Sequence, residues 1–410
     1  MKILLVHSSY QQPGGEDIVF DQEHRMLERA GHEVVLYRRS NSEIESYSAM
    51  ARLALVKRVI WASKTRQDFV RLLGKAKPDL VHVHNTFVMI SPSIYSACKE
   101  ADIPVVQTLH NYRLLCPAAT FFRDNHPCED CLKHSLWQGI RHGCYRNSHS
   151  ATAAVALMLA VHRWRETWHQ MVACYVALTE FARNKFVEGG LPPSKIFVKP
   201  NFVHPDPGQS SSEGEYAIFV GRLSAEKRVN TLLAAWKRVR TRIPLLILGG
   251  GPQIERLKMQ ATQSGLSGLH FMGNLSHHEA LESIKKARFL VMPSQAYENF
   301  PMSIIEAFAC RKPVLCSRLG AMQEIVEDGR TGLHITPGDP DDLAEKVEWA
   351  WSHPERMCEM GSEARNGYEE RYTAEKNYPI LMEIYQRAMA ACHRQAAESA
   401  ITSGLPGEFG

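Results

Sequence analysis

The sequence predicts an α/β protein made of two Rossmann-like, doubly wound domains that face each other across a cleft. Three observations lead to this prediction. The chain has 410 residues, which is too long for one ordinary hydrophobic core and suits two domains of roughly 200 residues each. Short apolar runs rich in β-branched residues alternate with amphipathic stretches, as in parallel sheets covered by helices on both faces. A polar segment rich in Pro, Gly and Ser, residues 204–214, separates two similar halves.

Six apolar runs in each half are expected to be strands. In the first half they are residues 2–6, 34–37, 80–83, 104–108, 174–178 and 196–200. In the second half they are residues 216–220, 245–248, 269–272, 289–292, 313–316 and 332–335. The alternation of strands with helical stretches predicts a parallel sheet in each half, and ligands of such sheets bind at the carboxyl ends of the strands.

The domain boundaries follow from these elements. The expected order is an N-terminal domain over 1–203 with an irregular cysteine-containing insertion over 111–150, a linker over 204–214, a C-terminal domain over 215–372, a helix over 373–395 and a tail over 396–410. The helix is expected to cross back onto the N-terminal domain. The tail is expected to be flexible, because it ends in a short polar stretch rich in glycine.

The composition and charge exclude several classes of protein. The charged fraction of 22% and the hydrophobic fraction of 44% are typical of globular chains and exclude a fibrous or disordered protein. No apolar run approaches the roughly 20 residues of a membrane-spanning helix, and the first residues lack the features of a secretory signal. We therefore expect a cytoplasmic protein. Residues 1–205 carry a net charge of +7, which suits an anionic ligand but not duplex nucleic acid.

The most informative motif follows a predicted strand and reads ENFPMSIIEAF, beginning at Glu298. Pro301 predicts the first position of a helix, where its missing N–H costs little. The backbone N–H groups of Met302 and Ser303 would then face an anion, assisted by the helix dipole. Glu298 precedes this helix and Glu306 lies inside it, so both carboxylates can accept hydrogen bonds from hydroxyls of one ligand. The alternative is two ordinary glutamates, one near the helix start and one solvated.

Two further loops follow neighbouring strands of the second half. Gly221 comes directly after the first of these strands, and Arg222 and Lys227 supply two cations five residues apart, an arrangement suited to a diphosphate. Gly250 is the middle of three glycines after the next strand and allows a ligand to approach the backbone closely. The alternative is a pair of ordinary βα turns with solvated cations. Three such loops at one sheet edge favour a binding site.

These motifs together resemble those of a known family. The segments GRLSAEKR, from Gly221, and ENFPMSIIEAFACRKPVL, from Glu298, are similar to motifs of the retaining nucleotide-sugar glycosyltransferases with the GT-B fold, called family 4 or glycosyl transferases group 1. The second segment matches the family's E-x7-E motif. The resemblance implies that the N-terminal domain binds the acceptor and that the C-terminal domain binds the donor, without a catalytic cofactor.

The resemblance also implies roles for individual residues. Arg222 and Lys227 would neutralise the donor diphosphate, Glu306 would hold the ribose, and Glu298 would hold the donor sugar. The implied catalytic residues are His110, Glu298, Arg222 and Lys227. The implied donor-binding residues are Gly221, Arg222, Lys227, Gly250, Glu298, Asn299, Phe300, Met302, Ser303 and Glu306. The implied acceptor-side residues are Gly14, Gly15, Glu16 and Asn111.

The sequence departs from the family pattern at three of its motif positions. Asn111 follows the active-site histidine, where the family usually has aspartate. Asn299 follows the first glutamate of the E-x7-E motif, where glycine is more frequent, and Arg311 replaces a common glycine. The change at Asn299 is expected to alter the donor pocket.

The insertion contains four cysteines. They are Cys116, Cys128, Cys131 and Cys144. A Cys-x2-Cys pair with another cysteine about a dozen residues to each side is typical of a structural zinc site with four thiolate ligands. Reduced thiols or a disulfide between Cys116 and Cys144 are the alternatives, and His126 or His142 could replace a ligand. A zinc ion here would order the segment that follows His110.

Residues 50–77 are rich in Lys and Arg, with Trp61 and Phe69 interleaved. A basic amphipathic helix beside an acceptor site can lie on an anionic membrane surface, which would place the protein at the inner face of the membrane. The alternative is a covering helix with a solvated basic face.

The expected function is retaining transfer of a sugar from a nucleoside diphosphate sugar to a glycan, a lipid-linked acceptor or a small polyol, in the synthesis of cell-surface polysaccharide or glycolipid. Two other functions fit the same fold. One is a nucleotide-sugar epimerase, which would need no acceptor. The other is a catalytically silent homologue that acts as a partner subunit, although such a protein needs none of the charged residues above.

Overall fold

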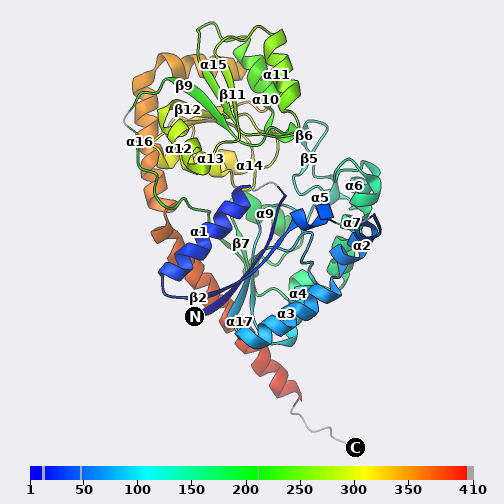
Figure 1. Ribbon diagram of the computed structural model, residues 1–410. Helices are drawn as coiled ribbons and strands as arrows, with labels where there is room; N and C mark the ends of the chain where they lie inside the picture. Colours follow the sequence, from blue (N-terminus) through cyan, green and yellow to red (C-terminus); the bar gives the residue numbers. More distant parts are fainter. Residues whose placement is uncertain (12–13, 47–48, 211, 404–410) are drawn as a thin grey trace, which may run out of the picture.

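The computed structural model describes residues 1–11, 14–46, 49–210 and 212–403, and side chains within these ranges except in 45–54 and 395–403. Two α/β domains lie one above the other, each built around its own parallel sheet (Figure 1). This architecture confirms the predicted pair of doubly wound domains.

The N-terminal sheet has the strand order β2-β1-β3-β4-β7-β8, and all of its pairs are parallel. Its strands are β1 Lys2–Ser9, β2 Glu33–Ser40, β3 Leu80–Asn85, β4 Val105–Thr108, β7 Cys174–Ala177 and β8 Ile196–Val198. The central strands are almost fully buried, whereas β2 is partly exposed because it lies at the edge of the sheet. Chain order reverses between β1 and β3, which places a ligand crevice at their carboxyl ends.

The C-terminal sheet has the strand order β11-β10-β9-β12-β13-β14, also parallel throughout. Its strands are β9 Tyr216–Val220, β10 Leu245–Leu248, β11 Leu269–Gly273, β12 Ala287–Met292, β13 Val314–Ser317 and β14 Gly332–Ile335. This is the strand order of dinucleotide-binding folds, and chain order reverses between β9 and β12. The loops after these two strands therefore border the crevice in which such folds bind ligands.

Helices cover both faces of each sheet. Around the N-terminal sheet they are α1 Gly15–Arg29, α2 Ala49–Ile60, α3 Ser63–Ala76, α4 Ser93–Glu100, α7 His149–Trp164, α8 Thr167–Gln170 and α9 Glu180–Glu188. Around the C-terminal sheet they are α10 Val229–Trp236, α11 Ile254–Gln263, α12 His277–Lys286, α13 Met302–Ala309, α14 Gly320–Ile325, α15 Pro340–Ser352 and α16 Pro354–Arg371. Successive side chains of a strand point to opposite faces of the sheet, so one strand can contribute to the cores on both faces. Ile3 and Leu5 of β1 belong to one core cluster, and Leu4 and Val6 belong to the other.

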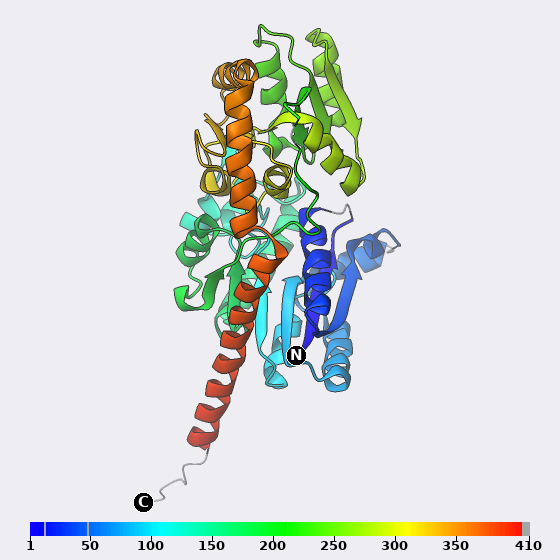
Figure 2. The ribbon, with the colours of Figure 1, turned by 90° about the vertical axis from the view of Figure 1, so that its left-hand side faces the viewer.

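The chain passes between the domains twice. The first passage is the expected linker, which is anchored to α16 through an ion pair between Asp206 and Arg365 (2.5 Å). The second is the junction of α16 with α17 (Ala374–Ser403), and the two helices follow each other along the length of the molecule (Figure 2). Helix α17 packs against β7, β4 and α1 of the N-terminal domain.

Helix α17 is longer than the sequence predicts. Residues 396–403, expected to belong to a flexible tail, continue the helix to Ser403. The tail sequence up to this point lacks glycine and proline, so nothing in it stops a helix that has already started. Residues 404–410 lie outside the described part of the chain.

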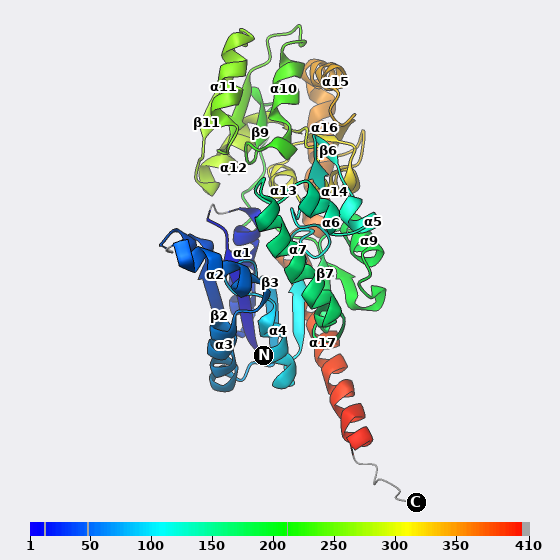
Figure 3. The same cartoon turned by 90° about the vertical axis from the view of Figure 1, so that its right-hand side faces the viewer.

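The basic segment 50–77 forms two helices, α2 and α3, instead of one. The break follows from Ala62, whose N–H donates to Ser91 Oγ (3.0 Å) rather than to a helical carbonyl. Phe69 is fully buried, and Trp61 stacks on His162 of α7, beside which α2 lies (Figure 3). These aromatic residues contact the protein itself, and membrane contact through this segment stays a prediction. Within the described ranges, no helix is both long enough and apolar enough to cross a bilayer.

The cysteine-containing insertion contacts the C-terminal domain, because its Asn125 accepts a hydrogen bond from Arg228 at 2.8 Å. It contains a two-stranded hairpin, β5 Phe122–Arg123 and β6 His126–Pro127, followed by the short helices α5 Asp130–Lys133 and α6 Trp137–Arg141. The hairpin projects toward the C-terminal domain (Figures 1 and 3).

Candidate functional site

Two of the predicted donor residues meet at the point where the C-terminal sheet reverses its chain order. Lys227, from the loop after β9, donates to Glu298 Oε1, from the loop after β12, at 2.8 Å. Ser294 Oγ donates to the same oxygen at 2.5 Å. Both charged side chains are largely buried. The predicted diphosphate-binding cation and sugar-binding carboxylate therefore neutralise each other.

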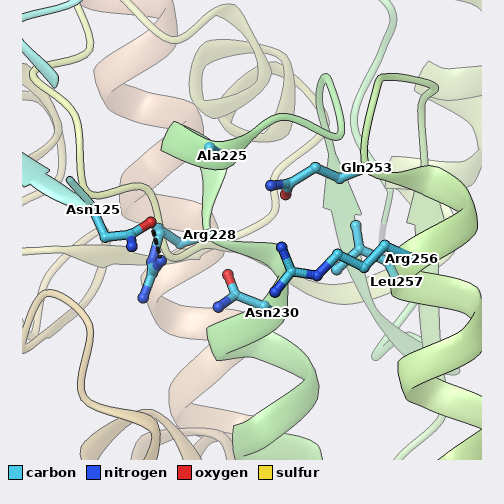
Figure 4. A pocket seen from close by; sticks show the side chains of 7 residues that line it. All are labelled: Asn125, Ala225, Arg228, Asn230, Gln253, Arg256 and Leu257. Carbon is cyan, nitrogen blue, oxygen red and sulfur yellow. Dashed lines mark hydrogen bonds between the residues drawn. The ribbon is translucent and has the colours of Figure 1, made fainter. Parts of the chain in front are cut away.

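Arg222 is exposed, and no described residue pairs with its guanidinium. A cavity opens between Arg228, which follows Lys227 in the chain, and Arg256 (Figure 4). The cavity is also lined by Asn125, Ala225, Asn230, Gln253 and Leu257. The sequence gives a weak signal for this cavity, because Arg228 directly follows the predicted cation motif.

The three glycines after β10 have a structural explanation. A Cβ on Gly249 would lie 2.1 Å from the carbonyl oxygen of Gly221, and one on Gly251 would lie 2.5 Å from that of Leu223. Both glycines also have positive φ. This loop must therefore be glycine-rich in order to pack against the neighbouring loop. A Cβ on Gly250 would meet Asn274 at 2.9 Å, so contact of Gly250 with a donor stays a prediction.

Glu306 of α13 has a partner that the motifs do not include. Its Oε1 lies 2.9 Å from Nε2 of His277, the first residue of α12. The hydrogen bond to Glu306 raises the pKa of His277. The only sequence signal was a capping box formed by Ser276 and Glu279, which predicts a helix start here and so places His277 at the sheet edge.

The N-terminus of α13 faces the other domain. The helix begins at Met302, with Pro301 as its N-cap and not as its first residue. A Cβ on Gly15 would lie 3.3 Å from Met302 Cγ, so the predicted acceptor loop touches the predicted donor helix. The N–H groups of Met302 and Ser303 have no carbonyl partner within the helix and border this junction.

The two residues before Pro301 lie at the junction between the domains. The side-chain amide of Asn299 donates to the backbone carbonyl of Leu109, next to His110. Phe300 is buried and packs edge-on against Tyr372, with ring centroids 6.0 Å apart. The Asn299 side chain thus makes an interdomain contact that glycine could not make, and the Phe300 ring packs at the junction of α16 and α17.

His110 lies against a second histidine. Its Nε2 is 2.9 Å from Nδ1 of His84, and the rings stack with centroids 5.1 Å apart. His84 Nε2 lies 3.2 Å from Glu23 Oε1. Burial and the neighbouring His82 lower the pKa of His84 to about 3, and burial and His84 hold the pKa of His110 well below its ordinary value. Both imidazoles are therefore neutral near pH 7.

Glu23 belongs to a buried charged network. Its Oε2 lies 3.1 Å from Nζ of Lys199, and each side chain is 1% exposed. Lys199 also donates to Asn377 of α17 at 2.9 Å. Burial alone would raise the pKa of Glu23, but Lys199 and His82 hold it well below its ordinary value. Glu23, His82 and His84 are close enough together to hold a metal ion, but the ammonium group of Lys199 already neutralises the carboxylate.

The predicted acceptor-side residues meet beside His110. Asn111 Nδ2 contacts the Tyr10 hydroxyl at 3.2 Å and Glu16 Oε2 at 3.5 Å, while Gly14 N–H donates to Asp17 at 2.9 Å. Burial, together with Asp17, raises the pKa of Glu16 to about 8. An aspartate in place of Asn111 would add a third carboxyl group here, which explains why asparagine suits this chain.

A cavity opens next to His110 within the N-terminal domain. Its lining includes Phe87, Tyr95, His110, Asn111 and Arg113. Arg113 lies over the Phe87 ring, 4.3 Å from its centroid. Such a mixture of aromatic and hydrogen-bonding groups suits a polyhydroxylated molecule with apolar C–H faces.

The family models match almost the whole chain in two parts. Residues 13–207 match the model described as Glycosyltransferase Family 4, and residues 204–367 match Glycosyl transferases group 1. The D-rhamnosyltransferase WbpZ of Pseudomonas aeruginosa is 30% identical over 161 residues, which is 39% of this chain and 42% of that protein. The glycogen synthase of Mycobacterium tuberculosis is 28% identical over 292 residues, 68% of this chain and 61% of that protein. The matches to the first curated relatives span about half of those relatives' length.

Solved structures share the fold at low sequence identity. The Anabaena protein Alr3699/HepE, solved in complex with UDP, has a TM-score of 0.64 and 18% identity, covering 98% of this chain and 100% of that chain. Sucrose-phosphate synthase from Thermosynechococcus elongatus has a TM-score of 0.71 and 18% identity, covering 95% and 99%. Together with the family matches, this two-domain architecture shows that the chain belongs to the group 1 glycosyltransferases with the GT-B fold.

Proposed function

We propose that the protein transfers a sugar from a nucleoside diphosphate sugar to a hydroxyl group of a glycan, a lipid-linked acceptor or a polyol, with retention of anomeric configuration. One observation carries the proposal. The donor helix α13 meets Gly15, at the start of α1, through Met302, and the loop before α13 meets Leu109, next to His110, through Asn299. A sugar held by Glu298 would thus lie between the loops of both domains, with His110 on its far side.

Donor binding would exchange one ion pair for another. Arg222, which has no partner among the described residues, and Lys227 would both move onto the diphosphate, where their charges stabilise the leaving nucleotide as the glycosidic bond breaks. Glu298 would then lose Lys227 and gain the hydroxyls of the sugar. The Lys227–Glu298 pair at 2.8 Å would keep both groups in place until the donor arrives. The UDP and UDP-glucose complexes of the structural neighbour HepE support a nucleotide-sugar donor.

The network behind His110 would fix its tautomer. Ionised Glu23 can only accept a hydrogen bond, so neutral His84 carries its proton on Nε2 and accepts on Nδ1. His110 must then donate from Nε2 to His84. Its Nδ1 keeps a lone pair and can accept a hydrogen bond from a hydroxyl of the reacting sugar. Glu23 and His84 are therefore positioning residues for His110.

Ligand binding tests the donor site. UDP, GDP, ADP, CDP and TDP, each with and without a sugar, should differ in the rise of melting temperature that they cause, because only a ligand of the folded state stabilises it. The selective nucleotide should lose its effect in Lys227→Ala and in Glu306→Ala. Lys237→Ala removes an exposed lysine elsewhere in the same domain and should leave the effect unchanged. Unchanged donor affinity in both site variants would contradict the assignment.

Product analysis tests the reaction. With the selected donor and a panel of acceptors, the new glycosidic bond should have the anomeric configuration of the donor, as read by NMR. An inverted product would contradict the retaining mechanism. Turnover of the nucleotide sugar without any acceptor would support the epimerase, and donor binding without turnover would support the silent homologue.

A further inference from the structure

A cavity of about 110 Å³ lies where the β5–β6 hairpin of the insertion meets the C-terminal domain (Figure 4). It is lined by Asn125 at the hairpin tip, by residues of the loop after β9 and the start of α10, and by residues at the start of α11. Its volume is several times the roughly 10–15 Å³ that one water molecule requires. The cavity therefore has room for a small polyatomic group.

The side chains around this cavity are positively charged and not negatively charged. Arg228 and Arg256 line it, and none of the described residues that line it is acidic. The acidic neighbours of these arginines in the sequence have other partners. Glu226 accepts a hydrogen bond from a serine hydroxyl of its own loop at 2.5 Å, and Glu255 lies 3.5 Å from the Lys258 ammonium. Two guanidinium groups without a paired carboxylate favour an anionic ligand.

The guanidinium of Arg228 is only partly hydrogen-bonded. Its Nη1 donates to Asn125 Oδ1 at 2.8 Å, whereas its Nε is buried and has no partner among the described residues. Arg256 is exposed and donates to no described residue. Figure 4 shows the side chains of Arg256 and Gln253 extending from the start of α11 toward Asn230, and both amides can donate as well. Because buried polar groups are almost always hydrogen-bonded, these donors indicate a position for an acceptor.

The backbone around the cavity adds to its positive potential. Arg228 is the N-cap of α10 and Gln253 is the N-cap of α11, so the positive ends of two helix dipoles border the same space. Arg228 also has φ of +53°, a left-handed conformation that glycine adopts without strain and other residues rarely adopt. An arginine at such a position indicates that its side chain is needed there.

We propose that this cavity binds one phosphate group, either as inorganic phosphate or as the phosphate monoester of a small molecule. A phosphate group carries a charge of about −1.5 to −2 at pH 7, which matches two guanidinium groups, whereas a carboxylate carries only one charge. The site differs from the proposed diphosphate site. Lys227 donates to Glu298, whereas the next residue, Arg228, donates to the hairpin.

A bound phosphate group would link the two domains. The hairpin has two residues in each strand and is marginal without further contacts. The four cysteines of the insertion are free thiols and, within the described part of the chain, do not form a set of metal ligands, so zinc binding there stays a prediction. Phosphate held by Arg228 and Arg256 would strengthen the contact with Asn125. It would also order the loop that carries Lys227.

Isothermal titration calorimetry of the full chain with inorganic phosphate is the direct test. At constant ionic strength in chloride, and with UDP present, we expect saturable binding of one phosphate per chain. Arg228→Gly, which suits the left-handed backbone, and Arg256→Gln should each weaken this binding at least about tenfold. Arg242→Gln removes an exposed arginine before β10 and should bind phosphate like the parent protein. Unchanged affinity in both cavity variants would overturn the proposal, and so would competition between phosphate and UDP.

Two further probes distinguish the sources of the phosphate group. Glucose 6-phosphate should bind where glucose does not. Tighter binding of this ester than of inorganic phosphate would support a phosphorylated small molecule, and equal affinity would support free phosphate. Acetate should bind more weakly than either, and acetate binding as tight as that of phosphate would overturn the proposal.

Hydrogen–deuterium exchange tests the link between the domains. Phosphate should slow amide exchange in residues 122–127 and 225–230 of the parent protein, and Arg228→Gly should lose this effect. Equal exchange with and without phosphate in the parent protein would overturn the proposal. These readouts do not depend on glycosyl transfer, so they can fail or succeed independently of the proposed reaction.

Discussion

Nε2 of His110 lies 2.9 Å from Nδ1 of His84, so the candidate active-site histidine of the N-terminal domain is held by a second, fully buried histidine. This contact predicts that His84→Phe lowers kcat, because His110 loses the acceptor that fixes its proton on Nε2. Loss of one such hydrogen bond is worth about 1 kcal/mol, or roughly a five- to tenfold decrease.

Steady-state kinetics with the cognate donor would measure this effect. The KM for the donor should change little, because His84 does not reach the donor. His84→Gln keeps an acceptor near the same place and should recover part of the activity. Equal losses in both variants, or a loss confined to KM, would mean that His84 only fills space.

The buried pair Glu23–Lys199 predicts a large effect on stability. Glu23→Gln leaves the Lys199 ammonium without a counter-charge at 1% exposure, and breaking a buried ion pair in this way costs about 3–5 kcal/mol. The free energy of unfolding, measured by urea denaturation, should fall accordingly. Glu28→Gln, on the exposed face of the same helix, should change it by less than about 0.5 kcal/mol. A double variant, Glu23→Gln with Lys199→Met, should be more stable than Glu23→Gln alone.

The pair His277–Glu306 predicts a pH dependence of donor binding. The pKa of His277 is raised by Glu306, so the ion pair is complete at low pH and is lost as the pH rises through that pKa. Ribose hydroxyls would compete with His277 for Glu306, so donor affinity should increase over the same range. Isothermal titration calorimetry at several pH values would measure the affinity for the donor.

Substitutions separate this effect from other titrations. His277→Ala should bind the donor more tightly at low pH and show a flatter profile, whereas the exposed neighbour variant His278→Ala should behave like the parent protein. An unchanged profile in His277→Ala would show that another group is responsible.

Glu16 predicts a pH dependence of the protein's stability, because its carboxyl group is buried. Its pKa rises from the ordinary 4.5 to about 8, so the folded state favours the protonated carboxyl. Its contribution to stability is complete below about pH 4.5 and decreases as the pH rises towards 8. Glu16→Gln should remove this decrease, and the difference in melting temperature between variant and parent should grow over that range. A constant difference across the range would indicate that Glu16 is already ionised at neutral pH.

Much of the fold and part of the site could be predicted from the sequence. Runs such as 216–220 and 289–292 are apolar, short and β-branched, which is enough to place strands, and motifs such as that from Glu298 follow them directly. Local patterns also located the cysteine insertion. They did not locate the break between α2 and α3, because it depends on Ser91, a residue distant in the sequence that takes the N–H of Ala62.

The sequence by itself therefore determined the two α/β domains and the loops at their carboxyl edges, because strand pattern and turn residues act over a few neighbouring positions. Only the tertiary structure decided which charges meet. It paired Lys227 with Glu298, Glu306 with His277, His110 with His84, and His84 with Glu23. The partners in each pair come from different loops, helices or strands, and only packing of both sheets brings them within hydrogen-bond distance. Proximity across the fold is a property of three-dimensional packing, and spacing along the chain does not encode it.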